Sequence, residues 1–175
     1  MVKRIAKYLL KRKVSKQNRT VKAFNLAEIN SALIVYNASS EEHRNKVIQL
    51  ARFFKEERIK TETLGFYKKK NKNDQPPQDE AGYFYFDKEE INWLGFPTST
   101  QVNELINKGH NLLIDLNLEN LFCLEVITSL SNANFKVGKS QAYQKEVCDM
   151  TIDTKDKNLD FLIDQIKNYL KKINR

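Results

Sequence analysis

One short segment of this chain has the residue types of a phosphate-binding loop. Gly138-Lys139-Ser140 repeats the end of the motif in which backbone N–H groups surround a phosphate and a lysine contacts it. The full motif also needs a glycine five positions before Gly138, where this chain has Ala133. In addition, Phe135 to Val137 occupies the place of the loop, and no glycines have dinucleotide-binding spacing. The sequence therefore predicts no nucleotide hydrolysis at this triplet.

A second group of polar residues follows the strands that the sequence predicts. Open parallel sheets bind ligands at the carboxyl ends of their strands, so these residues could form a small-molecule or phosphometabolite site. The candidates are Asn37, Ser39, Ser40, Asp115, Asn117 and Lys139, with Lys68 to Lys70 nearby. Glu41, Glu42 and Glu119 are expected in the first turns of the following helices, where their charge would oppose a phosphate. Helix capping explains the same polar residues, and both interpretations stay open.

The groups that could do acid-base chemistry are few. Asp115 lies in an otherwise apolar strand, and His43 and His110 are the two histidines. A carboxylate at a strand's end more commonly accepts hydrogen bonds, and neither histidine has a nucleophile nearby in sequence. Cys123 and Cys148 lack the spacing of a metal-binding pair. We therefore expect no catalytic residue, no cofactor and no metal, with an enzyme at the carboxyl edge as the alternative.

Charge is the most asymmetric property of the sequence. Residues 1–22 hold nine of the chain's 30 Lys and Arg and none of its 22 Asp and Glu. The remaining 153 residues have 21 basic and 22 acidic residues, so the net charge of +8 belongs to the first segment. A separate cationic block is typical of electrostatic attachment. The candidate phosphate-contacting residues are Lys3, Arg4, Lys7, Lys11, Arg12, Lys13, Lys16, Arg19 and Lys22.

A helix is expected at the start of this segment, with an apolar and a basic side. Val2, Ile5, Ala6 and Leu9 would form the apolar side, and Lys3, Arg4, Lys7 and Lys11 the basic side. Three roles stay open for this helix. It could pack its apolar side on the domain and leave its basic face in solvent, with no partner. Its basic face could instead contact RNA or a ribonucleoprotein such as the ribosome, or an anionic membrane surface. RNA is favoured over membrane because the apolar side is small and basic residues continue beyond the helix. Sequence-specific recognition of RNA is not expected, since no basic strand interleaved with aromatic residues is present.

The elements that would position these residues alternate between strands and helices. Strands are predicted at 29–36, 61–67, 83–86, 111–116, 135–138 and 149–152, with helices between them and after the last. This pattern predicts the α/β class: a single three-layer domain with a mostly parallel sheet, preceded by a basic amphipathic N-terminal helix. Residues 1–22 would form the basic arm and 23–175 the domain. Residues 68–80, which have no apolar residue except two prolines, are expected to form a mobile surface loop.

Local patterns predict where the helices begin and which elements are buried. Ser39 with Glu42, and Thr98 with Gln101, match the capping box, and Asn117 is expected to cap the helix after it. An apolar run without alternation, such as 112–114, belongs to an interior strand covered on both faces. The next helix is apolar nearly all round, so its leucines and isoleucine should be among the most buried residues; these are Leu121, Leu124, Ile127 and Leu130.

The arrangement of these features resembles a known family. The basic N-terminal helix is followed by LLIDL at Leu112–Leu116 running into a buried helix, by FKVG at Phe135–Gly138 and by an amphipathic C-terminal helix. In this combination the chain resembles a family of short bacterial α/β proteins catalogued as a domain of unknown function. The resemblance covers nearly the whole chain and implies an α/β fold. It implies no activity and no site residues.

The sequence also suggests a location for the protein. No apolar run approaches the roughly 20 residues needed to cross a bilayer. Lys11 to Lys13 interrupts the first apolar residues after Leu10, which does not suit the apolar region of a signal peptide. We therefore expect a cytoplasmic, non-enzymatic module that attaches to RNA or a ribonucleoprotein through its basic N-terminal segment.

Overall fold

The computed structural model describes residues 2–154 and 158–173. Residues 1 and 174–175, at the ends of the predicted arm and domain, lie outside the described residues, as do 155–157. Six strands form one sheet within the described ranges: β1 (Ser31–Asn37), β2 (Lys60–Phe66), β3 (Tyr83–Phe86), β4 (Leu112–Leu116), β5 (Phe135–Lys139) and β6 (Met150–Ile152). Their order is β3-β2-β1-β4-β5-β6, and every neighbouring pair is parallel.

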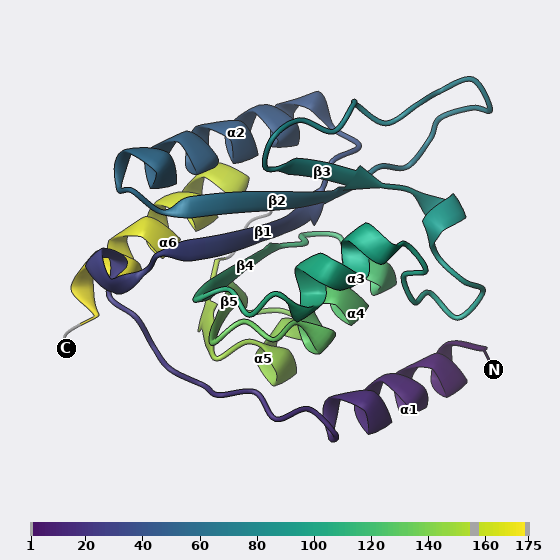
Figure 1. Cartoon of the computed structure of the whole chain (residues 1–175), viewed down its shortest axis with the longest axis horizontal. Helices are drawn as coiled ribbons and strands as arrows, with labels where there is room; N and C mark the ends of the chain where they lie inside the picture. The colour runs from purple at the N-terminus through teal and green to yellow at the C-terminus, as the bar shows by residue number, and fades with distance from the viewer. Residues whose placement is uncertain (1, 155–157, 174–175) are drawn as a thin grey trace.

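The helices lie on both faces of this sheet. They are α1 (Val2–Val14), α2 (Glu41–Glu56), α3 (Thr100–Asn107), α4 (Phe122–Leu130), α5 (Gln144–Val147) and α6 (Leu159–Lys172), with short 3₁₀ helices η1 (Leu26–Glu28) and η2 (Lys88–Glu90). Helices α2 and α6 cover one face, whereas α3 and α4 cover the other (Figure 1). Helix α1 lies outside α4. The three-layer α/β architecture and the N-terminal helix are thus confirmed.

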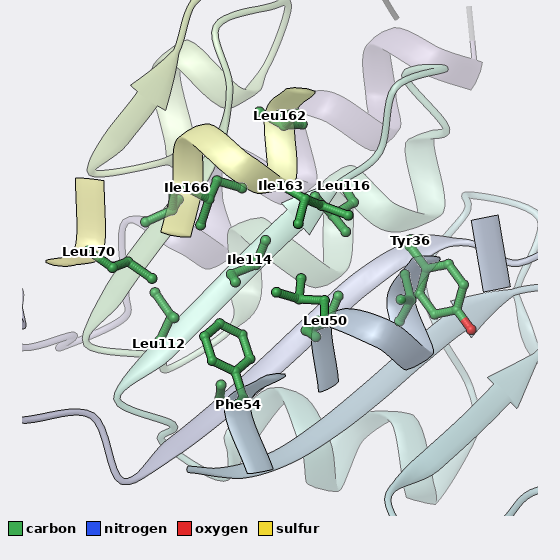
Figure 2. Packing of buried hydrophobic residues seen from close by; sticks show 14 of the residues in the cluster. Tyr36, Leu50, Phe54, Leu112, Ile114, Leu116, Leu162, Ile163, Ile166 and Leu170 are labelled. Carbon is green, nitrogen blue, oxygen red and sulfur yellow. The ribbon is translucent and has the colours of Figure 1, made fainter. Parts of the chain in front are cut away.

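The core explains why the central strand has an uninterrupted apolar run. Residues 112–114 are all fully buried, as predicted for an interior strand. Side chains of β4 alternate between the two faces, so Ile114 packs with Leu50 of α2 and Ile166 of α6, as Figure 2 shows. Leu113 points the other way and packs with Leu124 of α4. Both faces of β4 therefore need large apolar residues.

The burial of α4 is only partly as predicted. Leu124 and Ile127 are fully buried, whereas Leu121 and Leu130 are half-buried. Leu121 is the N-cap of α4 and Leu130 is its last residue, so both lie at ends of the helix that neighbouring elements cover less completely.

The start of α3 differs from its predicted position. The N-cap is Ser99, which makes no side-chain capping bond, so the predicted cap at Thr98 is wrong. The backbone N–H of Thr98 donates to Glu90 O at 2.8 Å, which holds Thr98 outside the helix. The last helix, α6, has Asn158 as its N-cap, whose side chain accepts from Phe161 N.

The segment after β2 is irregular. Residues 68–79 form no helix or strand, as expected, and the segment extends away from the sheet (Figure 1). Asp74 organises its first part, since its carboxylate accepts from the Tyr67 hydroxyl at 3.0 Å and from Lys70 N at 2.7 Å. The mobility of this loop stays a prediction.

Candidate functional site

The six candidate ligand residues lie along the carboxyl edge of the sheet, as their positions after the strands predict. Asn37 ends β1, Asp115 lies near the end of β4, and Lys139 ends β5. The strand order reverses between β1 and β4, and open sheets with this order bind ligands at that point. The question is therefore whether polar atoms at this edge are free to bind anything.

The point of reversal is bridged by a hydrogen bond from the end of β1 to the loop after β4. The Asn37 side chain donates to Glu119 Oε2 at 2.7 Å, and its own oxygen accepts from Ser39 N at 3.0 Å. The prediction that Glu119 lies in the first turn of the helix after β4 is wrong, because α4 begins only at Phe122. The Glu119 carboxylate instead accepts the hydrogen bond from Asn37 at the ends of β1 and β4.

The cap of α2 is Ser40 and not Ser39. Helix α2 begins after Ser40, whose hydroxyl accepts from His43 N at 3.4 Å, so the predicted cap at Ser39 is wrong. The Ser39 hydroxyl accepts from Lys68 N at 2.9 Å and ties the end of β1 to the end of β2. Both hydroxyls therefore have local structural roles.

Asp115 is the centre of a buried hydrogen-bond network. Its side chain is fully buried and accepts four hydrogen bonds, two on each oxygen. Asn117 N and Gln144 Nε2 donate to Oδ1 at 2.8 and 3.3 Å, and the hydroxyls of Thr128 and Tyr143 donate to Oδ2 at 2.8 and 2.6 Å. Burial raises the pKa of Asp115 to about 6, although the donors oppose this shift. A carboxylate enclosed in this way has no oxygen exposed to a substrate.

Asn117 and Lys139 are enclosed as well. The N-cap of α4 is Leu121, so the predicted cap at Asn117 is wrong. The Asn117 oxygen accepts from Leu121 N at 3.1 Å and its amide donates to the Tyr143 hydroxyl at 2.8 Å, which closes the turn before the helix. Lys139 is buried and is also engaged in interactions. The candidate residues at the carboxyl ends of β1, β4 and β5 are therefore already engaged in interactions within the protein.

Three members of the Asp115 network were not predicted. Thr128, Tyr143 and Gln144 lie 13, 28 and 29 residues from Asp115 in sequence. Gln144 is the first residue of α5 and Tyr143 is its N-cap, and this helix of four residues is too short for a periodic pattern to reveal. The available signal was indirect: a lone carboxylate in an apolar strand requires buried donors from elsewhere.

His110 belongs to a cluster at the opposite edge of the sheet. It is 2% exposed, and its Nε2 lies 2.7 Å from Glu62 Oε2. Lys108 Nζ donates to the other oxygen of Glu62 at 2.5 Å. Burial lowers the pKa of His110, and Glu62 partly offsets this shift. Burial alone would raise the pKa of Glu62, but hydrogen bonds from Lys108 and His110 outweigh it and the pKa is lowered. His43 lies apart from this cluster, half-buried in the first turns of α2.

Helix α1 docks on α4 through only part of the predicted apolar side: Ala6 is buried and Leu9 is half-buried, as expected, whereas Leu10 was not among the predicted residues. Ala6 and Leu10 are buried and pack with Val126 of α4. Val2 and Ile5, which were expected on the apolar side, remain 48% and 44% exposed. The small Ala6 side chain lets α1 approach α4 closely along this line, and Val2 and Ile5 then fall outside the contact.

The nine basic candidate residues do not form a uniform surface. Eight are exposed, whereas Arg19 is half-buried. Lys7 pairs with Glu125 at 3.7 Å, and Lys22 Nζ lies 4.8 Å from the centre of the Phe24 ring. Within the described ranges, six others have no carboxylate within ion-pair distance: Lys3, Arg4, Lys11, Arg12, Lys13 and Lys16. We call these six residues the α1 cations.

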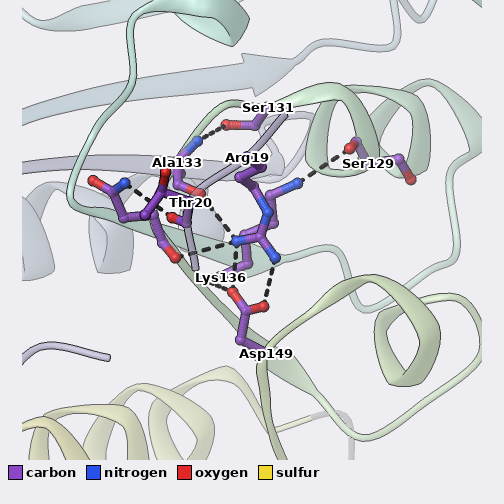
Figure 3. A network of polar contacts seen from close by, with 8 residues as sticks. Arg19, Thr20, Ser129, Ser131, Ala133, Lys136 and Asp149 are labelled. Atoms are coloured by element: carbon purple, nitrogen blue, oxygen red, sulfur yellow. Dashed lines mark hydrogen bonds and ion pairs between the residues drawn. The ribbon is translucent and has the colours of Figure 1, made fainter. Parts of the chain in front are cut away.

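Arg19 has a structural position instead. Its guanidinium pairs with both oxygens of Asp149, at 2.8 and 2.5 Å, and donates to the carbonyl oxygens of Ala133 and Asn134 (Figure 3). Beside it Lys136 is buried and donates to Ser129 O; burial lowers its pKa to about 8. Asp149 thus balances two neighbouring cations, and Arg19 fastens the segment after α1 to the domain.

None of the helices in the described part of the chain is long and apolar enough to cross a membrane. Across residues 2–154 and 158–173, no three His, Cys, Asp or Glu side chains gather where they could hold a metal ion.

Comparison with known proteins identifies a family and no activity. No similar protein was found among curated proteins or among solved structures. A model of a family of unknown function (DUF6913) matches residues 3–173, and the chain therefore belongs to this family.

Proposed function

We propose that this protein is a non-enzymatic module that associates with RNA, or with a ribonucleoprotein such as the ribosome, in the cytoplasm. The observation that carries the proposal is the set of α1 cations, which are exposed and have no carboxylate partner among the described residues. A surface of this kind binds a polyanion by releasing its counterions. The carboxyl edge supports the non-enzymatic part, because the side chains of Asn37, Asp115 and Asn117 are held in hydrogen bonds within the protein.

An anionic membrane surface is the second candidate. The exposed Val2, Ile5 and Tyr8 on α1 favour it, because a helix that lies on a membrane inserts apolar side chains between lipids. RNA is the stronger proposal for two reasons. The Ala6 and Leu10 side of α1 is already buried against α4, and the unpaired basic residues continue past α1 to Lys16.

Charge neutralisation tests the proposal more cleanly than truncation. Removal of residues 1–22 would uncover Val126 and Phe96, which pack against α1, and would remove the ion pair of Arg19. A triple variant with Lys3→Gln, Arg4→Gln and Lys11→Gln alters only exposed side chains. We expect it to melt like the wild type and to bind a short RNA duplex at low salt at least ten-fold more weakly.

The matched control removes the same number of charges elsewhere. Lys68, Lys70 and Lys72 are exposed in the loop after β2, and their replacement by Gln should change RNA affinity little. An equal loss in both triple variants would show that only net charge matters and would contradict the proposal. Binding of the wild type to anionic vesicles but not to RNA would favour the membrane instead.

A further inference from the structure

A groove lies between α1 and the turn that follows η2. Its α1 wall is formed by Leu9, Arg12, Lys13 and Lys16, and its other wall includes Leu94 and Phe96. The groove has a volume of about 440 Å³, within the ~300–1,000 Å³ range of small-molecule sites. It therefore combines an apolar floor with three of the α1 cations. We call it the α1 groove.

The turn on the far side of the groove is held in one conformation. The side-chain oxygen of Asn92 accepts from Leu94 N and Phe96 N, both at 3.0 Å, and Asn92 N donates to Phe96 O at 2.9 Å. Gly95 has a φ of +88°, and a Cβ there would lie 2.6 Å from the Phe122 ring, so both conformation and space require glycine. The hydrogen bonds of Asn92 and the glycine at position 95 thus fix the conformation of the turn.

This turn exposes the one tryptophan of the chain. Trp93 is 74% exposed, although a tryptophan is usually buried over most of its surface. Its chain neighbours Asn92 and Leu94 both line the α1 groove, whereas Trp93 itself does not, so Trp93 lies beside the groove on the same turn. An ordered turn that holds a large aromatic side chain in water gives up the free energy of burying it. A ligand that stacks on the ring would recover that free energy.

We propose that the α1 groove binds unpaired nucleotides of RNA, with a base stacked on Trp93 and the phosphates against Arg12, Lys13 and Lys16. This inference rests on the proposed function and deepens it by naming a substrate class, RNA that contains unpaired nucleotides. A cationic groove beside an exposed aromatic ring is the combination that single-strand binders use, because phosphates need the charge and every base has a face that stacks. Arg12, Lys13 and Lys16 have no carboxylate partner in the described chain, so their charge is available to phosphate.

The single tryptophan makes the test direct, because all tryptophan fluorescence comes from the proposed site. A short poly(U) oligonucleotide should quench the Trp93 emission on binding. Trp93→Ala should weaken poly(U) binding about five-fold or more, whereas Trp93→Phe should retain most of the affinity. Tyr169→Ala is the matched control, since Tyr169 is an exposed aromatic residue of α6 on the other face of the sheet, and it should bind poly(U) like the wild type.

The outcomes separate this inference from the proposed function. One outcome is that poly(U) binds and that its affinity falls in the Lys3, Arg4 and Lys11 variant, while Trp93 emission does not change and Trp93→Ala binds poly(U) like the wild type. In that case the groove inference is wrong and the proposed function stands. Absence of binding to poly(U) and to RNA duplex at low salt overturns both. A shift of Trp93 emission with anionic vesicles and none with RNA would assign the groove to a membrane. Thermal melts should show that Trp93→Ala folds like the wild type.

Discussion

The carboxyl edge of the sheet and the α1 surface hold similar numbers of polar residues but use them in opposite ways. At the edge, Asp115 accepts four hydrogen bonds and Asn37 bridges to Glu119, so the polar atoms satisfy one another inside the protein. On α1 and just after it, Arg12 and Lys16 have no carboxylate partner within the described ranges and remain exposed. A satisfied cluster stabilises the fold and has little left for a ligand. Exposed charges without partners, in contrast, gain interaction free energy when an oppositely charged molecule binds.

The largest expected effect is the pH dependence of the stability that Asp115 contributes, and it tests the carboxyl-edge half of the comparison. Its pKa of about 6 in the folded protein lies above the ~3.9 of an unfolded aspartate. The folded state therefore binds the proton more tightly, and the stability that Asp115 contributes is fully present below about pH 4 and is lost as pH rises through about 6. Two pKa units correspond to a loss on the order of 3 kcal/mol.

The Asp115→Asn variant isolates this contribution. Denaturant unfolding at several pH values should show that the advantage of the wild type over Asp115→Asn shrinks between about pH 4 and pH 7, because the amide does not titrate. Asp164→Asn, which removes an exposed carboxylate of α6, serves as the control. A difference that is independent of pH, or that grows as pH rises, would show that Asp115 is not the enclosed carboxylate that the structure describes.

A smaller expected effect distinguishes two arginines of the basic arm, one structural and one exposed. Arg19→Gln removes a bidentate pair with Asp149 and two bonds to carbonyl oxygens, and should cost about 1–3 kcal/mol of unfolding free energy. Arg12→Gln removes the same charge from an exposed position and should leave the melting curve unchanged. RNA affinity should respond in the opposite order. Equal stability of the two variants would mean that Arg19 is not a structural residue.

Local pattern was sufficient for much of the fold. The β1-α2-β2 unit and the interior position of β4 follow from apolar periodicity, which depends on residues close in sequence. The exact caps did not follow, because Ser39 and Ser40 are both suitable and only the bond from Lys68 N to Ser39 decides between them. That bond joins residues 29 positions apart.

The site was predicted less completely, for the same physical reason. The charge block of residues 1–22 is visible in the sequence, but the difference between Arg12 and Arg19 depends on Asp149, 130 residues beyond Arg19. Likewise, which face of α1 is buried depends on where Val126 meets Ala6. Long-range packing sets each of these features.

The salt dependence of RNA binding tests the central claim most directly. For an RNA duplex, the logarithm of the association constant should fall steeply with the logarithm of salt concentration in the wild type and in the Lys68, Lys70 and Lys72 control. In the variant with Lys3, Arg4 and Lys11 neutralised, loss of three phosphate contacts should make the slope shallower by about 2 to 3. A variant slope equal to that of the wild type would contradict the assignment of the α1 cations to RNA phosphates.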